Sequence, residues 1–222
     1  FIVTLLISGA SQLYIKSTFG KWDGIANSAS MAGVQVGERL VQRASFGGAS
    51  GPATNISFKV VPGELSDHFD PRTKEIGLSQ QVAQHDSVAA MAVTAHEVGH
   101  AQQDAEGTVA MRARAFLVPA VTFSPMASYA LIFVGLIFNL TGLFWLGIIV
   151  FALMVVFSIL TLPVEIGASR RALVMLRETG MLANQQDEDG VKRVLTAAAL
   201  TYVAAAVTSI LTLLYYISLA RR

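Results

Sequence analysis

The fold is decided by a long uncharged stretch that contains LIFVGLIFNLTGLFWLGIIVF, residues 131–151. Residues 115–164 include no Asp, Glu, Lys or Arg. This stretch of about 50 residues is more than twice the roughly 20 that a membrane helix needs, so it must turn back once. The turn-forming residues NLTG, at 139–142, interrupt the apolar pattern. We therefore predict a transmembrane hairpin with spans near residues 116–138 and 143–162.

Uncharged segments near both ends of the chain predict further spans. Residues 194–220 lie between two basic pairs and are long enough to cross a bilayer. Residues 1–15 are apolar up to Lys16 and begin with Phe1 instead of Met. We interpret them as the end of a truncated membrane helix, in preference to a signal-peptide remnant, because no A-x-A-like cleavage site precedes Lys16. A buried soluble core is the alternative, but soluble helices rarely lack charge over such lengths. We expect four spans.

The composition agrees with a membrane protein and excludes other classes. Hydrophobic residues make up 53% of the chain and charged residues 14%, whereas soluble domains average about 25% charged residues. The net charge is +1 and there is no polybasic tract, so the sequence lacks the basic surface that nucleic-acid binding requires. The absence of cysteine excludes disulfides and thiolate metal sites. Any metal must therefore be held by His, Asp or Glu.

Four spans would place residues 16–114 and 164–193 on the same side of the membrane. The short segment 164–193 contains five basic residues, and the turn at 139–142 contains none. Basic residues are enriched in short cytoplasmic loops. We therefore expect an integral membrane protein in a plasma membrane of bacterial type, with its polar parts in the cytoplasm.

The polar segment before the hairpin has the pattern of a small mixed domain. Residues 26–45 favour a helix, with apolar side chains roughly on one side. NISFKVV, at 55–61, and KEIGLS, at 74–79, favour strands, with turn residues at 70–73 before the second. Asp86-Ser87 offers an N-cap for a helix that extends to Gly107. This last helix contains the sequence HEVGH.

HEVGH has the spacing of a zinc site that activates water. His96 and His100 are four residues apart, so on a helix they project from one face and can reach the same Zn²⁺. Glu97 remains next to the metal, where it can take a proton from zinc-bound water. Zinc lowers the pKa of that water from 15.7 toward about 7. A solvated helix with two chance histidines is the alternative interpretation.

A catalytic zinc site needs a third protein ligand. The candidates are His68, His85 and carboxylates from other segments. His85 lies about three turns before His96, too far along the helix to share its metal. His68 could reach this metal only if the folded chain brought its segment back to the helix. Glu165 is the stronger candidate because it directly follows a span and is the first acid after the uncharged stretch. Alternatively, Glu165 is an interfacial carboxylate at a helix start, favoured by the macrodipole.

Three motifs, SDHFDPRTKEIGLS, HEVGHAQQ and LPVEIGASRRAL, resemble in this order the YugP-like membrane zinc metallopeptidases. The resemblance covers nearly the whole chain. It implies that His96 and His100 bind zinc, that Glu97 is the base and that Glu165 is the third ligand. The implied fold is mainly α, with about four transmembrane helices and a small α+β zinc metalloprotease domain of zincin type, which combines a catalytic helix with a short sheet.

The pattern is more distantly similar to the gluzincins of the CAAX-prenyl and heat-shock type, whose third ligand lies in E-x-x-A-D. Ser169 stands where those enzymes have Asp, and Ile166 replaces a Phe that is frequent in YugP-like proteins. Gluzincins receive an extended substrate on an edge strand before the catalytic helix. This likeness implies that residues 74–79 bind substrate, through the residues Glu75, Ile76, Gly77 and Leu78, although a plain structural strand is an equal alternative.

The leading hypothesis is a membrane-anchored zinc endopeptidase acting on protein or peptide substrates near the cytoplasmic face, with Glu97 assisting attack by zinc-bound water. An intramembrane protease is less favoured because polar residues follow the motif immediately, at 102–106. A further alternative is a zinc-clipped scaffold, a non-catalytic membrane protein in which zinc joins the polar domain to the span before Glu165. Arg170 and Arg171 could stabilise an oxyanion, but a solvated basic cluster is the preferred interpretation.

Overall fold

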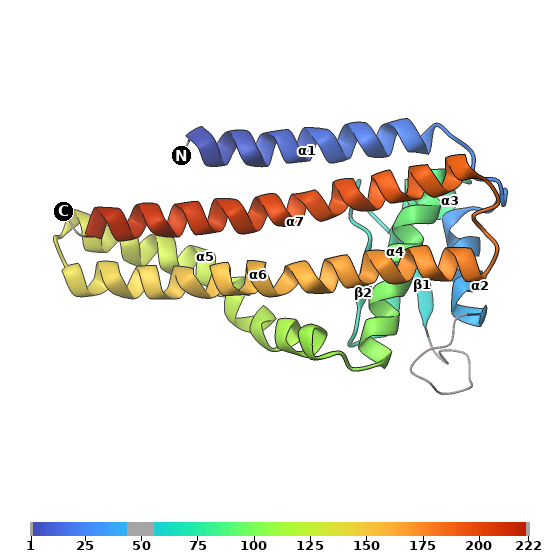
Figure 1. Ribbon diagram of the computed structural model, residues 1–222. Helices are drawn as coiled ribbons and strands as arrows, with labels where there is room; N and C mark the ends of the chain where they lie inside the picture. Colours follow the sequence, from blue (N-terminus) through green and yellow to red (C-terminus); the bar gives the residue numbers. More distant parts are fainter. Residues whose placement is uncertain (1, 44–55, 221–222) are drawn as a thin grey trace. The chain divides into compact units, whose positions relative to one another are not determined.

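The computed structural model of the chain describes residues 2–43 and 56–220 (Figure 1). Within these ranges the protein is mainly helical with a small three-stranded sheet, as predicted, while the zincin arrangement stays a prediction. The helices are α1 (Ile2–Asp23), α2 (Gly33–Arg43), α3 (Gln80–Gln84), α4 (Val88–Ala105), α5 (Val109–Ile137), α6 (Thr141–Glu178) and α7 (Gln185–Ala220). The strands are β1 (Ser57–Val61), β2 (His68–Asp70) and β3 (Glu75–Ser79).

The described residues form two compact units. The apolar unit contains α1 up to Gln12, α5, α6 up to Pro163 and α7 from Leu200. The polar unit contains the described residues from Leu13 to Thr108 and those from 164 to 199. The domain boundaries expected from the sequence stay predictions.

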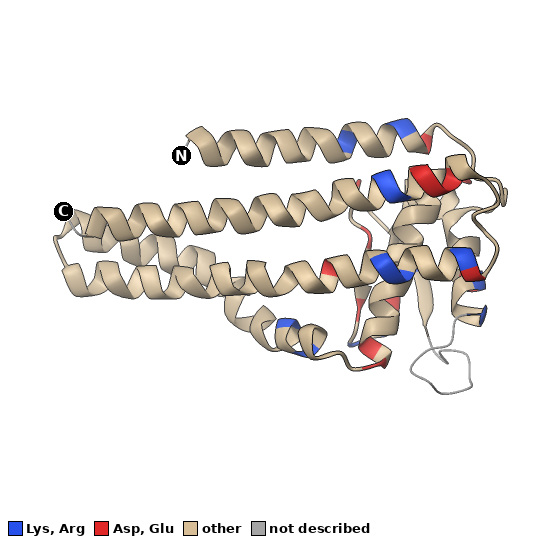
Figure 2. Cartoon of the chain, viewed as in Figure 1, with Lys and Arg blue, Asp and Glu red and all other residues tan. Residues whose placement is uncertain are grey.

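Among residues 2–43 and 56–220, three helices are long and apolar enough to cross a membrane, namely α5, α6 and α7. Figure 2 shows the long stretches of α6 and α7 that carry no charged residue. Helix α1 has 22 residues but is not among these three helices. The structure therefore supports three membrane-length helices, and the fourth span remains a prediction.

The hairpin turns where the sequence predicts it, since α5 ends at Ile137 and α6 begins at Thr141. Asn139 adopts a left-handed backbone with φ 54°, which Asn tolerates better than most residues. A β-carbon at Gly135 would lie 2.6 Å from the backbone nitrogen of Phe144. Small residues allow such close approach of membrane helices. The two helices therefore pack backbone to backbone near their turn.

Helix α6 is longer than predicted and continues through Pro163 to Glu178. The expectation that a new helix begins near Glu165 is therefore wrong, because Glu165 lies inside α6. A proline in a helix removes one backbone hydrogen bond, which neighbouring groups can compensate. The helix-start macrodipole consequently gives no explanation for this carboxylate. Helix α2 begins at Gly33, later than the predicted start at residue 26, and residues 44 and 45 of the predicted helix lie outside the described residues.

Strand β3 lies in the middle of the sheet, paired in parallel with β1 and antiparallel with β2. Strands β1 and β3 were predicted from the sequence, whereas β2 and α3 were not. The expectation of an edge strand at residues 74–79 is wrong, because β3 lies between β1, which pairs with Glu75–Ser79, and β2, which pairs with Glu75, Ile76 and Gly77. Over Glu75–Gly77 both edges of β3 are occupied, and binding of substrate by Glu75, Ile76, Gly77 and Leu78 stays a prediction.

Helix α4 forms the centre of the polar unit. Its N-cap is Ser87, as predicted, and the Ser87 hydroxyl accepts a hydrogen bond of 3.0 Å from the backbone N–H of Ala90. Residues on all sides of α4 are buried, including Val88, Met91 and Val98. A helix that is buried all round belongs to a core. The HEVGH residues thus lie in the buried core of this unit.

We predict that Gly135→Ala destabilises the protein by about 1–3 kcal/mol, because a methyl group cannot fit against the backbone of Phe144 without moving the helices apart. Thermal or denaturant unfolding of the detergent-solubilised chain measures the effect. Gly142→Ala in α6 is the control, since a β-carbon at this position meets nothing within 4 Å. Equal stability of the two variants would contradict the close packing.

Candidate metal centre

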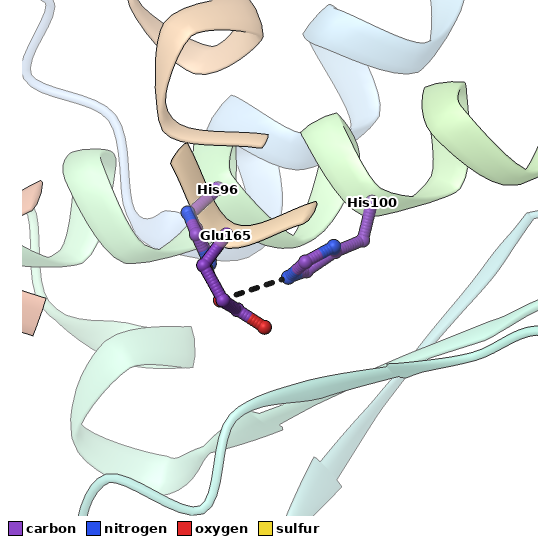
Figure 3. Close-up of side chains that lie close together, drawn as sticks. All are labelled: His96, His100 and Glu165. Carbon is purple, nitrogen blue, oxygen red and sulfur yellow. Dashed lines mark hydrogen bonds and ion pairs between the residues drawn. The ribbon is translucent and has the colours of Figure 1, made fainter. Parts of the chain in front are cut away.

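His96 and His100 project from one side of α4, and the side chain of Glu165 approaches them from α6 (Figure 3). All three residues belong to the polar unit. They are buried, with exposed fractions of 9% for His96, 6% for His100 and 1% for Glu165. The residues that the sequence places about 65 positions apart therefore meet inside the protein.

The atoms that can bind a metal point toward one another. Oε2 of Glu165 lies 3.1 Å from Nε2 of His96 and 3.4 Å from Nε2 of His100. One ligand atom of each residue falls within 4.8 Å of the others. The two imidazole rings are edge to face, with their centroids 4.7 Å apart. This is a compact three-residue cluster with all its ligand atoms on one side.

Close approach of α4 to α6 produces this convergence. A β-carbon at Gly99 would lie 2.5 Å from the carbonyl oxygen of Ala168. Contacts under 3.0 Å of a β-carbon with backbone do not occur in real structures, so the position requires glycine. Gly99 precedes His100 directly, and Ala168 is one turn beyond Glu165. The glycine inside HEVGH therefore has a packing role that the metal-binding motif alone does not reveal.

The other ring nitrogens of the two histidines have polar neighbours. Nδ1 of His100 lies 3.1 Å from Oε1 of Gln103, and Nδ1 of His96 lies 3.2 Å from the hydroxyl of Ser169. Histidines that bind a metal usually hydrogen-bond through the second ring nitrogen, which fixes the ring orientation. Ser169 thus contacts His96 from the position where gluzincins of the E-x-x-A-D pattern have a carboxylate.

Glu97 is buried beside the cluster, with 6% of its surface exposed. Burial raises the pKa of its carboxyl group to about 7; the charge of Glu165 adds to this effect and His96 opposes it. Desolvation favours the neutral form of a carboxylic acid. A carboxyl group with this pKa can both accept and release a proton near neutral pH.

The remaining candidate ligands lie elsewhere in the polar unit. Nδ1 of His85 is 3.0 Å from a carboxylate oxygen of Asp23, and Nδ1 of His68 is 2.9 Å from the carbonyl oxygen of Ser66. Neither histidine belongs to the cluster around Glu165. Among the described residues, the structure therefore brings only Glu165 of the proposed third ligands to His96 and His100.

The two arginines after Glu165 differ in their surroundings. Arg171 makes a two-pronged ion pair with Glu106, with nitrogen-to-oxygen distances of 2.6 and 2.7 Å. Arg170 is exposed. The pair between Arg171 and Glu106 joins α6 to the end of α4, which is a structural role. Neither arginine is placed in the cluster.

The donor set fits zinc. Two imidazole nitrogens and one carboxylate oxygen are the protein ligands of catalytic zinc sites of the His₂Glu class, in which further positions are left for water or substrate. Calcium and magnesium prefer oxygen ligands, so two histidines disfavour these ions. The tight burial of a carboxylate against two imidazoles is also the arrangement that a bound cation stabilises.

Comparisons with known proteins agree with this chemistry. Residues 1–221 match the family described as "Putative neutral zinc metallopeptidase". The chain is 35% identical over 216 residues to a Bacillus subtilis (strain 168) protein named "Putative membrane protease YugP", covering 97% of this chain and 92% of that protein. No solved structure matches the chain.

We predict that Gly99→Ala weakens zinc binding and destabilises the polar unit, because the added methyl group would push α6 and its Glu165 away from the histidines. Overpacking of this kind costs about 1–3 kcal/mol. Zinc affinity is measured by competition with a chromophoric chelator, and stability by thermal unfolding.

Gly20→Ala in α1 is the matched control, because a β-carbon at Gly20 meets nothing within 4 Å. Wild-type zinc affinity in Gly99→Ala would show that the approach of the two helices does not position Glu165.

Proposed function

Because the chain belongs to the neutral zinc metallopeptidase family, we propose that it is a membrane-anchored endopeptidase that hydrolyses peptide bonds. The observation that supports this most strongly is the meeting of the Glu165 carboxylate with both HEVGH histidines, at 3.1 and 3.4 Å. Burial of a carboxylate between two imidazoles costs hydration, and a metal bound by all three groups would offset this cost.

His96, His100 and Glu165 are the proposed ligands of Zn²⁺. When bound, zinc supplies Lewis-acid chemistry, which polarises a carbonyl group and lowers the pKa of water to about 7. The three side chains come from two helices that are buried and closely packed. They are therefore held in place before substrate arrives, which is the condition for effective positioning.

Glu97 is the proposed general base. Its carboxylate accepts a proton from the attacking water molecule and passes it to the amine that leaves when the peptide bond breaks. Glu97 adjoins His96 in sequence but is rotated by about 100° around α4, so it stands beside the ligands and remains available for proton transfer. The buried surroundings limit exchange of this proton with bulk water.

We place the centre at the cytoplasmic side of the membrane. Helices α5 and α6 are both long enough to cross a bilayer. If both cross it, the residues after α6 lie on the same side of the membrane as the residues before Val109. The five basic residues of 164–193 stand on that side, with none in the turn at 139–142. The charged residues Lys74 and Asp104, which form an ion pair in the polar unit, also favour an aqueous setting.

We predict that Glu97→Gln lowers peptidase activity by about 10²- to 10⁴-fold while zinc stays bound, because the change removes a proton acceptor and none of the ligands. Cleavage of an unfolded protein such as casein is measured with the detergent-solubilised chain, and zinc content is measured on the same sample. Glu38→Gln at an exposed position of α2 is the matched control.

Full activity of zinc-loaded Glu97→Gln would overturn the proposed mechanism. A wild-type protein that binds zinc tightly but cleaves no peptide or protein would favour the zinc-clipped scaffold.

A further inference from the structure

Gln103 is a buried glutamine, 4% exposed, that lies between the two helices carrying the proposed zinc ligands. It follows His100 by three residues on α4. Its amide makes two hydrogen bonds in opposite directions, at 3.1 Å to Nδ1 of His100 and at 2.8 Å to the carbonyl oxygen of Val164. Val164 directly precedes Glu165. One side chain thus contacts one ligand and the backbone next to another.

These two hydrogen bonds determine which nitrogen of His100 carries the proton. The carbonyl oxygen of Val164 can only accept a hydrogen bond, so the NH₂ group of Gln103 must face it. The amide oxygen of Gln103 then faces Nδ1 of His100, and this nitrogen must be the donor. In the neutral ring Nε2 therefore keeps its lone pair, and Nε2 is the atom that points toward Glu165.

We infer that Gln103 is a positioning residue of the zinc centre, which couples His100 on α4 to the α6 backbone beside Glu165. This inference rests on the proposed function of the cluster. Gln103 holds His100 in the tautomer whose Nε2 can bind the metal, and it fixes the turn of α6 from which Glu165 projects. A primary amide is required, because the position needs an acceptor on one side and a donor on the other.

Gly167 supplies independent support. A β-carbon at Gly167 would lie 2.6 Å from the amide nitrogen of Gln103. The absence of a side chain at this position therefore gives the amide room to reach the carbonyl group of Val164. The affected atom is the end of a flexible side chain, so Gly167→Ala displaces the amide while leaving the backbone of both helices undisturbed. This variant tests the hydrogen bonds without changing Gln103 itself.

Substitutions can test the amide oxygen and the NH₂ group of Gln103 separately. Gln103→Met keeps the length of the side chain but removes both hydrogen bonds. Gln103→Glu keeps an acceptor for His100 but loses the donor to Val164, and it places a carboxylate against a carbonyl oxygen. We expect zinc affinity to fall about 10- to 100-fold in Gln103→Met and in Gly167→Ala, and to fall less in Gln103→Glu.

The experiment measures zinc affinity by chelator competition on the full chain in detergent, together with the visible absorption spectrum of the Co²⁺-loaded protein. The spectrum reports the geometry of the ligands, so a residue with only a stabilising role would not change it. Gln84→Met at an exposed position of α3 and Gly142→Ala in α6 are the matched controls. We expect both controls to retain the affinity and spectrum of the wild type.

Wild-type affinity and an unchanged Co²⁺ spectrum in Gln103→Met would overturn the inference and leave the proposed function intact. If Gln103→Met does not fold, Gly167→Ala decides the question by the same two readouts. Absence of zinc binding by the wild-type chain would overturn the proposed function, and the role of Gln103 with it.

Discussion

The metal centre depends on the contact between α4 and α6 at Gly99 and Ala168, where a β-carbon would be only 2.5 Å from the facing carbonyl oxygen. His96 and His100 lie three residues before and one residue after Gly99, and Glu165 lies three residues before Ala168. Residues three or four apart share one helix face, so His96 shares a face with both Gly99 and His100 on α4, and Glu165 shares one with Ala168 on α6. Close contact at this pair of residues therefore brings the three ligand side chains together, and any side chain at Gly99 would separate them.

The groups that face the Nδ1 atoms of the two histidines are neutral. Gln103 faces His100, and the Ser169 hydroxyl faces His96, whereas many zinc-binding histidines hydrogen-bond to a carboxylate that raises their basicity. Neutral partners donate less electron density to the imidazoles and leave more positive charge on a bound metal. The charge that lies close to the cluster comes from Glu165 and Glu97. The electrostatics of this centre therefore depend chiefly on these two carboxylates.

Sequence patterns predicted the features that have local signals. The hairpin turn at residues 139–142 interrupts an uncharged run, Ser87 has the chemistry of an N-cap, and β1 and β3 show the alternation of strands. The order of the strands is a non-local property, and β2 has only three residues, so local patterns predict neither β2 nor the central position of β3. A new helix was expected near Glu165, after the span, whereas α6 continues through this region to Glu178. Gly99 and Gln103 acquire their roles only when α6 packs against α4, and no spacing along one helix could reveal this contact.

The most direct test is a crystal or cryo-EM structure of the zinc-loaded chain, with the metal located by its anomalous scattering or its density. We expect one zinc ion bound by Nε2 of His96, Nε2 of His100 and a carboxylate oxygen of Glu165, at about 2.0–2.2 Å. Zinc held by the two histidines with Glu165 beyond ligand reach, or with a third protein ligand from another segment, would contradict the three-residue centre.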